Sequence, residues 1–388
     1  MKLKQTRLRA GLAAILTLAL SSLACQSVAG GTVAPRPTEE RLPNPEGLAT
    51  DAFLSPTAEA TKPGATDPQP TQAPAGPGGD GSDFTQPTAI GQTLSVASWD
   101  VAVLAYYYGD DALKSLETMS DMVDALPEGR QYVIAQIKAT SRFNDNENHA
   151  VPYNVTLLAD NRHGYFSRGF PMVKEPFSGE VRNGESVTGW LVFQAPSETR
   201  NFQIVFSDYD NDFNLVEGYL ALTPDAALPP ADVASFPADN EIGRDPQSPA
   251  KIGDTVITGG FAVTITEILR GKAADEIINA ENAFAPSEPE GQEYALARVR
   301  VQALGVEPKL QHFTTILFSV QPTTGDPIGL PFLVLPGESV DAALVPGAVL
   351  EAWLPLALPV DDDGALLYYD PTFGFGDESP ARYFALQP

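Results

Sequence analysis

"PEGRQYVIAQIKAT", residues 127–140, is a stretch of alternating pattern that occurs twice in the chain. It returns as "PEGQEYALARVRVQ" at residues 289–302, an offset of 162 positions. One alternating face is apolar in both copies: Val133, Ala135, Ile137 and Ala139 in the first, and Ala295, Ala297, Val299 and Val301 in the second. A period of two with one apolar face predicts a half-buried β-strand. The stretch therefore predicts a β fold that is built twice.

Three further pairs of segments keep nearly the same offset. They are 90–103 with 252–265, 183–196 with 346–359, and 218–224 with 382–388, at offsets of 162, 163 and 164. Self-similarity at a fixed offset indicates a duplicated structural unit. We expect two homologous domains, 88–224 and 250–388, joined by a Pro-rich acidic linker over 225–249.

One segment in each copy, 110–126 in the first and 275–284 in the second, has helical rather than strand spacing. Its apolar residues are Leu113, Leu116, Met119, Val123 and Leu126 in the first copy, and Ile277, Ala280 and Phe284 in the second. Acidic residues precede both runs, as suits a helix N-terminus. The Asn183-Gly184 pair predicts a β-hairpin turn. Several short strands with turns between them predict a sandwich, here with a short helical insertion in an early loop.

The first 25 residues have the features of a bacterial lipoprotein signal. Lys2, Lys4, Arg7 and Arg9 precede an apolar run over 10–20, which is too short to span a bilayer. Small residues then lead to Cys25, the only cysteine in the chain. We expect a signal peptide over 1–24 and a lipid on Cys25 that anchors an exported protein to the outer face of the cell membrane. The alternative is an ordinary signal peptide that leaves a free thiol.

Residues 25–87 are rich in Pro, Thr, Ala and Gly. Such a composition offers few apolar side chains to offset the entropy of ordering, so it predicts a disordered stalk. The stalk is interpreted as a spacer or, alternatively, as a passive linker. The formal net charge of the whole chain is −26. An acidic surface repels nucleic acid, so no nucleic-acid partner is predicted.

A motif in the first copy carries a family resemblance. Its matching residues are Gly184, Ser186, Gly189, Leu191, Val192, Phe193 and Pro196. The second copy keeps Gly347, Leu354 and Pro359 but has Leu356 at the Phe position. Together with the stalk and the lipoprotein signal, this motif resembles the immunoglobulin-like domains of bacterial surface lipoproteins, a family of unknown function. The resemblance implies an all-β fold of two tandem immunoglobulin-like β-sandwiches on a stalk, and it supplies no catalytic residues.

No catalytic site is predicted, and the chain is not expected to be an enzyme. The histidines are His149, His163 and His312, and none has metal-binding spacing. Asp160, His163 and Ser167 could be imagined as a triad, but no nucleophile elbow accompanies them. The segment "DNRHG", 160–164, is better interpreted as a polar hairpin tip.

A calcium site is one interpretation of Asp208, Asp210 and Asp212, which occupy alternate positions. Calcium loops use this spacing because several oxygen ligands must converge on one ion. However, Phe213 stands where such a loop needs Gly, and Tyr219 where it needs a bidentate Glu. The alternative is a solvated acidic loop without any cofactor.

Trp190 and Trp353 occupy equivalent positions, and both point away from the expected inter-sheet core. Either the helical insertion covers them, or they are exposed anchors for a binding partner.

The leading functional prediction is a non-enzymatic binding or adhesion protein that contacts an envelope polymer or a protein ligand. The alternative is a structural or accessory subunit of an envelope or transport complex. An exposed apolar strip at the Trp190 face would favour the binding role. An apolar contact between the domains would favour the structural role.

Overall fold

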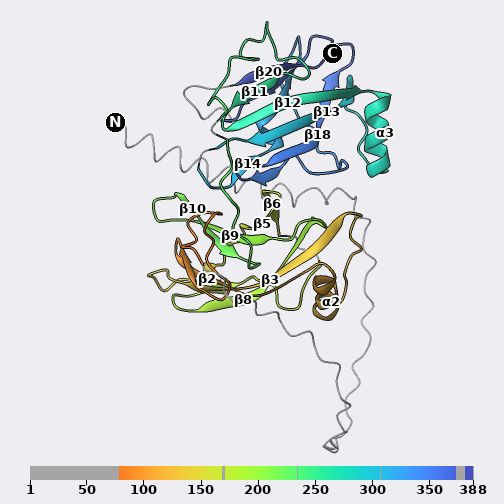
Figure 1. Cartoon of the computed structure of the whole chain (residues 1–388). Helices are drawn as coiled ribbons and strands as arrows, with labels where there is room; N and C mark the ends of the chain where they lie inside the picture. Colours follow the sequence, from red (N-terminus) through yellow and green to blue (C-terminus); the bar gives the residue numbers. More distant parts are fainter. Residues whose placement is uncertain (1–77, 168–170, 234, 306, 373–380, 388) are drawn as a thin grey trace, which may run out of the picture. The chain divides into compact units, whose positions relative to one another are not determined.

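Two four-stranded antiparallel sheets with the same strand order carry the repeat. The computed structural model describes residues 78–387 except 168–170, 234, 306 and 373–380 (Figure 1). The first sheet has the order β1 (Leu94–Val96), β2 (Trp99–Tyr108), β3 (Arg130–Ser141) and β8 (Ser186–Pro196). The second has β11 (Thr255–Thr258), β12 (Phe261–Arg270), β13 (Gln292–Ala303) and β18 (Val349–Pro359). The duplication seen in the sequence is therefore present as a repeated sheet.

Each repeated sheet has a partner sheet, and one of these partners draws strands from both halves of the chain. The six-stranded sheet has the order β10 (Leu215–Ala221), β9 (Phe202–Tyr209), β5 (Val155–Ala159), β6 (His163–Phe166), β17 (Ala342–Leu344) and β14 (Gln311–Phe313). The remaining four-stranded sheet has the order β16 (Ile328–Gly329), β15 (Phe318–Gln321), β19 (Leu366–Tyr369) and β20 (Arg382–Ala385). Two short strands, β4 (His149–Ala150) and β7 (Glu180–Val181), form a ribbon, and a 3-10 turn covers Thr315–Leu317.

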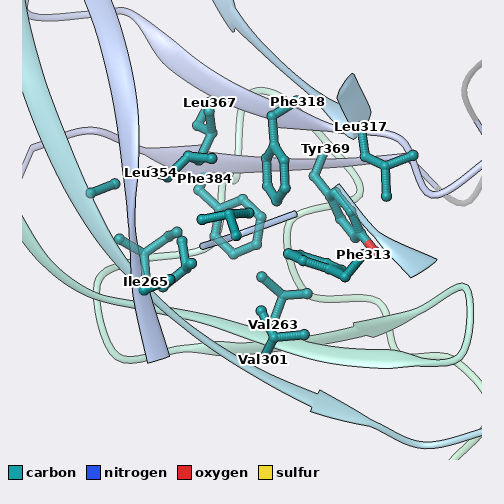
Figure 2. Close-up of a cluster of buried hydrophobic side chains, with 14 of the residues drawn as sticks. Val263, Ile265, Val301, Phe313, Leu317, Phe318, Leu354, Leu367, Tyr369 and Phe384 are labelled. Carbon is teal, nitrogen blue, oxygen red and sulfur yellow. The ribbon is translucent and has the colours of Figure 1, made fainter. Parts of the chain in front are cut away.

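Each half of the chain has its own hydrophobic core. The apolar faces predicted for the repeated strand, 133–139 and 295–301, are fully buried. In the second half, Val263 and Val301 face Phe313 and Phe384 across the core (Figure 2). The alternating pattern that predicted these strands is thus confirmed by the burial of the expected side chains.

The helical insertions are confirmed, with different bounds. Helix α2 covers Asp110–Met119 rather than 110–126, and α3 covers Lys272–Glu281 rather than 275–284. Both helices begin after a glycine with positive φ, Gly109 and Gly271. Helix α2 ends because Ser120 adopts an extended conformation. Val123 and Leu126 still pack against the same apolar cluster as the helix, so their helical spacing reflected burial rather than helix.

The Asn183-Gly184 turn forms, but it does not join a hairpin. Gly184 has a φ of 78°, and Glu185 N donates to Arg182 O at 2.9 Å. The strand before the turn, β7, pairs with β4, whereas β8 pairs with β3. The turn is instead held against Ser141, whose carbonyl accepts from Gly184 N at 2.8 Å.

The folded region begins before residue 88, so the predicted end of the stalk is wrong. Phe84 is 1% exposed, and its carbonyl accepts from Gln203 Nε2 at 2.8 Å. Tyr219 N donates to Gly81 O at 3.0 Å. Residues 78–87 are thus packed against β9 and β10. The rest of the stalk and the signal peptide, 1–77, lie outside the described residues.

The Pro-rich linker, 225–249, is packed rather than free. Leu228 and Val233 are 6% and 8% exposed and belong to two small apolar clusters. Asp239 accepts a hydrogen bond from the buried guanidinium of Arg382. Prolines in this segment therefore mark an irregular but ordered connection. Among the described helices, none is long and apolar enough to cross a membrane.

Candidate functional site

A short strand pairing joins the two halves of the chain. Strand β6 pairs with β17, with Gly164 opposite Ala343 and His163 opposite Leu344. A Cβ on Gly164 would lie 2.9 Å from the Cβ of Ala343 and 2.6 Å from Thr156 Cγ2. Only glycine fits this close approach, so Gly164 is what allows the sheet to continue from one half to the other.

The turn before β6 is inserted into this joint. Arg162 has a φ of 68°, and its carbonyl accepts from Val345 N at 3.1 Å. Its guanidinium donates to Pro346 O at 3.0 Å and to Pro229 O at 2.6 Å. The segment 160–164 is a hairpin tip, as predicted, but it docks on the second half and the linker instead of facing solvent.

His163 is buried at the joint and is no part of a triad. Its Nε2 donates to Val349 O at 3.0 Å, and burial lowers the pKa of the imidazole. Asp160 accepts from the backbone N–H groups of Arg200 and Asn201 instead. The structure therefore gives Asp160 and His163 separate backbone partners and assigns His163 a role in joining the halves.

An apolar cluster completes the joint. It combines side chains of the first half, the linker and the second half, namely Phe84, Leu158, Val205, Tyr219, Leu228, Leu310, Ala343 and Val345. The hydroxyl of Tyr219 donates to Glu217 at 2.7 Å and accepts from Leu310 N at 3.2 Å. Burial of this cluster stabilises one arrangement of the two halves through the hydrophobic effect.

A cleft of about 620 Å³ lies beside the joint and is lined by both halves. Arg130, the first residue of β3, reaches across it to Glu338 at 2.8 Å. The same guanidinium lies 6.0 Å from the ring centroid of Tyr165, within reach of a cation–π contact. Burial raises the pKa of the Tyr165 phenol, so this side chain is neutral at neutral pH and adds no charge to the cleft.

The cleft is rich in carboxylates. Those lining it are Glu128, Glu281, Glu338 and Asp341, and the basic side chain among its described lining residues is Arg130. Asp341 accepts from Thr314 Oγ1 at 2.6 Å and Thr315 N at 2.7 Å, and Glu338 is paired with Arg130. Glu128 and Glu281 form no ion pair within the described part of the chain. Phe166, which is half-exposed and stacks on His312, adds an aromatic surface. The cleft can thus offer a ligand both negative charge and an aromatic face.

The three predicted calcium ligands are not gathered around one position. Asp208 accepts from the indole Nε1 of Trp99 at 2.8 Å, and its burial raises the pKa of the carboxyl. Asp210 closes the tip of the β9–β10 hairpin by accepting from Asp212 N and Asn214 N, both at 2.9 Å. Across the described residues, no group of three His, Cys, Asp or Glu side chains could hold a metal ion.

The helices lie over both tryptophans. Trp190 stacks on Tyr107 at 6.0 Å within the cluster that includes Leu116 of α2. Trp353 belongs to the equivalent cluster under α3, with the Arg298 guanidinium 5.5 Å from its ring. Both rings are half-buried. Both tryptophans thus pack at the edge of the apolar cluster beneath a helix.

Sequence reasoning missed the residues of the cleft, although one signal was present. Arg130 lies inside the repeated stretch, but its counterpart in the second copy is Gln292. In the structure Arg130 forms the ion pair with Glu338.

Comparisons with known proteins give a few similarities. No protein-family model matches the chain, and no curated protein matches it. The solved structure of the yjhA protein from Bacillus subtilis matches 34% of this chain and 98% of its own, at 14% identity and a TM-score of 0.24. An uncharacterized beta-sandwich protein from Clostridium difficile 630 matches 34% of this chain and 91% of its own, at 8% identity and a TM-score of 0.22. Neither similarity bears on function.

Proposed function

We propose that this protein is a lipid-anchored extracellular binding protein without catalytic activity, made of two tandem immunoglobulin-like domains that bind their ligand in the joint cleft. The observation that carries this proposal is the cleft itself, which is lined by both halves and offers aromatic side chains beside carboxylates that have no ion-pair partner among the described residues. Ligand sites commonly occur where two domains meet. Trp190 is half-buried beside the cluster under helix α2, and the proposed site does not include it.

Filling the cleft tests this proposal. Ser339 is exposed and lines the cleft, so a Ser339→Trp substitution should occupy the space without disturbing a core. Ser178, an exposed serine on the corresponding loop of the first half, gives the matched control Ser178→Trp. We expect labelled full-length protein to bind isolated cell envelopes saturably, with affinity reduced at least tenfold by Ser339→Trp and unchanged by Ser178→Trp. Absence of saturable binding, or equal binding by both variants, would contradict the proposal.

A structural or accessory role is the second candidate, and the apolar joint supports it. A fixed angle between two domains suits a subunit that holds other proteins at a set distance, and the cluster around Phe84 and Leu310 provides such a contact. Under this role the protein should copurify in fixed stoichiometry with a membrane complex after cross-linking in cells, and Ser339→Trp should leave that yield unchanged.

The lipid anchor makes a prediction of its own. Cys25 provides the only thiol of the chain, so Cys25→Ser should abolish lipid attachment and release the protein from membranes. Mass spectrometry of the N-terminal peptide and fractionation of cells would measure both effects. A wild-type protein whose Cys25 carries no lipid would instead support the ordinary signal peptide.

A further inference from the structure

A strap of extended chain, residues 331–335, lies next to the cleft. Its side chains alternate between two faces. Leu333 and Leu335 pack against the cluster under α3, whereas Phe332 and Val334 are 93% and 49% exposed. The backbone of 331–335 makes no hydrogen bond to any other described residue. The strap thus presents free backbone groups together with an apolar outer face.

The loop that follows the strap differs between the two halves. There Trp190 N donates to Glu175 O at 2.8 Å and Phe177 N donates to Trp190 O at 3.0 Å, which closes the corresponding loop onto β8. A Cβ on Gly189 would lie 2.4 Å from Pro176 O, so this closure requires glycine. The counterpart of Gly189 in the second half is Ala352, which meets its loop through a single bridge to Glu338.

Further apolar surface adjoins the strap. Phe284 is 93% exposed and follows α3, and its neighbour Ala285 packs in the same cluster as Leu333 and Leu335. A nearly fully exposed phenylalanine gains nothing from the fold of its own chain. Phe284 and Phe332 therefore flank one cluster with two aromatic side chains that are available to a partner.

The strap runs directly into the acidic cleft. Leu335, its last residue, lines the cleft together with Glu281, the last residue of α3. Glu128 approaches the same cleft from the first half. Leu335 thus connects the strap with the carboxylates of the cleft. Negative charge at this position selects against acidic partners, including a second copy of this chain, whose net charge is −26.

We propose that the strap and the cleft together bind an extended polypeptide segment in which apolar side chains alternate with Lys or Arg. The segment adds its backbone to the free edge of 331–335 and packs its apolar side chains on Phe332 and Val334. Its basic side chains reach Glu128 and Glu281. Strand addition of this kind takes affinity from main-chain hydrogen bonds and specificity from alternate side chains. This inference rests on the proposed binding function and names its ligand class.

Synthetic peptides provide the probe. The full chain carrying Cys25→Ser is titrated with an eight-residue peptide that alternates Val and Lys, and with matched peptides that alternate Val with Glu and Ser with Lys. We expect saturable binding of the Val–Lys peptide, weakened by salt, and at least tenfold weaker binding of the other two. Equal binding of the Val–Glu peptide would overturn the proposal.

Three variants locate the site. The double variant Phe332→Ser with Val334→Ser should reduce the affinity for the Val–Lys peptide at least tenfold. The double variant Glu128→Gln with Glu281→Gln should reduce the affinity for the same peptide and make binding less dependent on salt. Tyr153→Ser, which changes an 81% exposed aromatic residue elsewhere, should leave the affinity unchanged. Peptide binding that none of these variants alters would overturn the inference.

Two outcomes separate this inference from the function on which it rests. If Ser339→Trp abolishes envelope binding while the Val–Lys peptide fails to bind, the cleft takes another class of ligand, so the inference fails and the proposed function stands. If vesicles of phosphatidylcholine bind wild type and not the strap variant, the strap contacts lipid, and the peptide inference is overturned. If neither envelopes nor peptide bind, both proposals fail.

Discussion

At the scale of single residues, the hydroxyl group of Tyr369 lies inside the second core and has no hydrogen-bond partner among the described residues. Its ring lies 4.8 Å from Phe318 and 5.9 Å from Phe313, between centroids, and the hydroxyl is buried among them (Figure 2). Burial raises the pKa of this phenol well above its usual range, so it stays neutral. An unpaired buried hydroxyl lowers stability because its bonds to water are lost without replacement.

Tyr369→Phe should therefore stabilise the protein, by about 1 kcal/mol in the free energy of unfolding. Denaturant unfolding monitored by circular dichroism would measure the change. Tyr219→Phe is the matched control, since the Tyr219 hydroxyl is paired with Glu217 and with Leu310 N, and its removal should destabilise. If Tyr369→Phe is the less stable protein, the hydroxyl has a partner and this interpretation is wrong.

His163 links stability to pH. Burial lowers its pKa in the folded state, a neighbouring Glu338 opposes this shift, and Arg130 adds to it. The unfolded state therefore binds more protons than the folded state just below the ordinary histidine pKa of about 6.5. Stability contributed by neutral His163 is present above that pH and is lost as the pH falls through it.

We expect the melting temperature to decline between pH 7.5 and 5.5, and to decline less in His163→Gln, whose amide can still donate to Val349 O. A slope that His163→Gln leaves unchanged would show that His163 is not the group responsible.

At the scale of elements, Gly189 controls how the loop 175–178 closes onto β8. A methyl group at this position would approach Pro176 O and Phe177 N to within 2.4 and 2.5 Å. Gly189→Ala should displace the loop, break both of its bonds to Trp190 and destabilise by about 2 kcal/mol, as overpacking commonly does. Hydrogen exchange at Phe177 and Trp190 should become faster. Ala352→Gly, the reciprocal change in the second half, should slow exchange along 336–339; if it does not, the methyl group does not limit the pairing of that loop with β18.

Strands and helices with long local patterns were predictable from the sequence, and elements held by distant contacts were not. The long strands β3 and β13 show a period of two because one face of each is buried. By contrast, β6 and β17 are short, and their pairing depends on a hairpin tip meeting a segment far along the chain. No local pattern encodes such a contact. The same applies to the cleft, because Arg130 and Glu338 come together only when the two halves of the chain are joined.

Composition predicted unpacked chain at the end of the stalk and in the linker, and this prediction was wrong for a physical reason. Residues 78–87 are as rich in Gly and Pro as the stalk before them, yet one aromatic side chain, Phe84, is enough to dock them in the joint cluster. In the linker, Leu228 and Val233 act in the same way. Isolated large apolar residues in a Pro-rich segment were the signal that these segments are packed.

At the scale of the whole molecule, the joint couples two halves that each possess a core. The described residues from 78 onward belong to one compact unit, within which the six-stranded sheet and the joint cluster connect the halves. Two domains with such an interface should unfold in a single transition, whereas loss of the interface should let each unfold on its own. The joint is therefore what makes the cleft a site of fixed geometry instead of a gap between independent domains.

Gly164→Val tests this coupling. A valine side chain would collide with Ala343 and Thr156, so β6 can no longer pair with β17, while both cores remain complete. Calorimetry should show one transition for wild type and two for Gly164→Val, the lower shifted down by several degrees. Gly329→Val places the same side chain on β16, where a Cβ meets nothing within 4 Å, and should keep a single transition. Because the cleft depends on the joint, Gly164→Val should also weaken envelope binding as strongly as Ser339→Trp; a variant that splits the transition yet binds like wild type would place the ligand on one half alone.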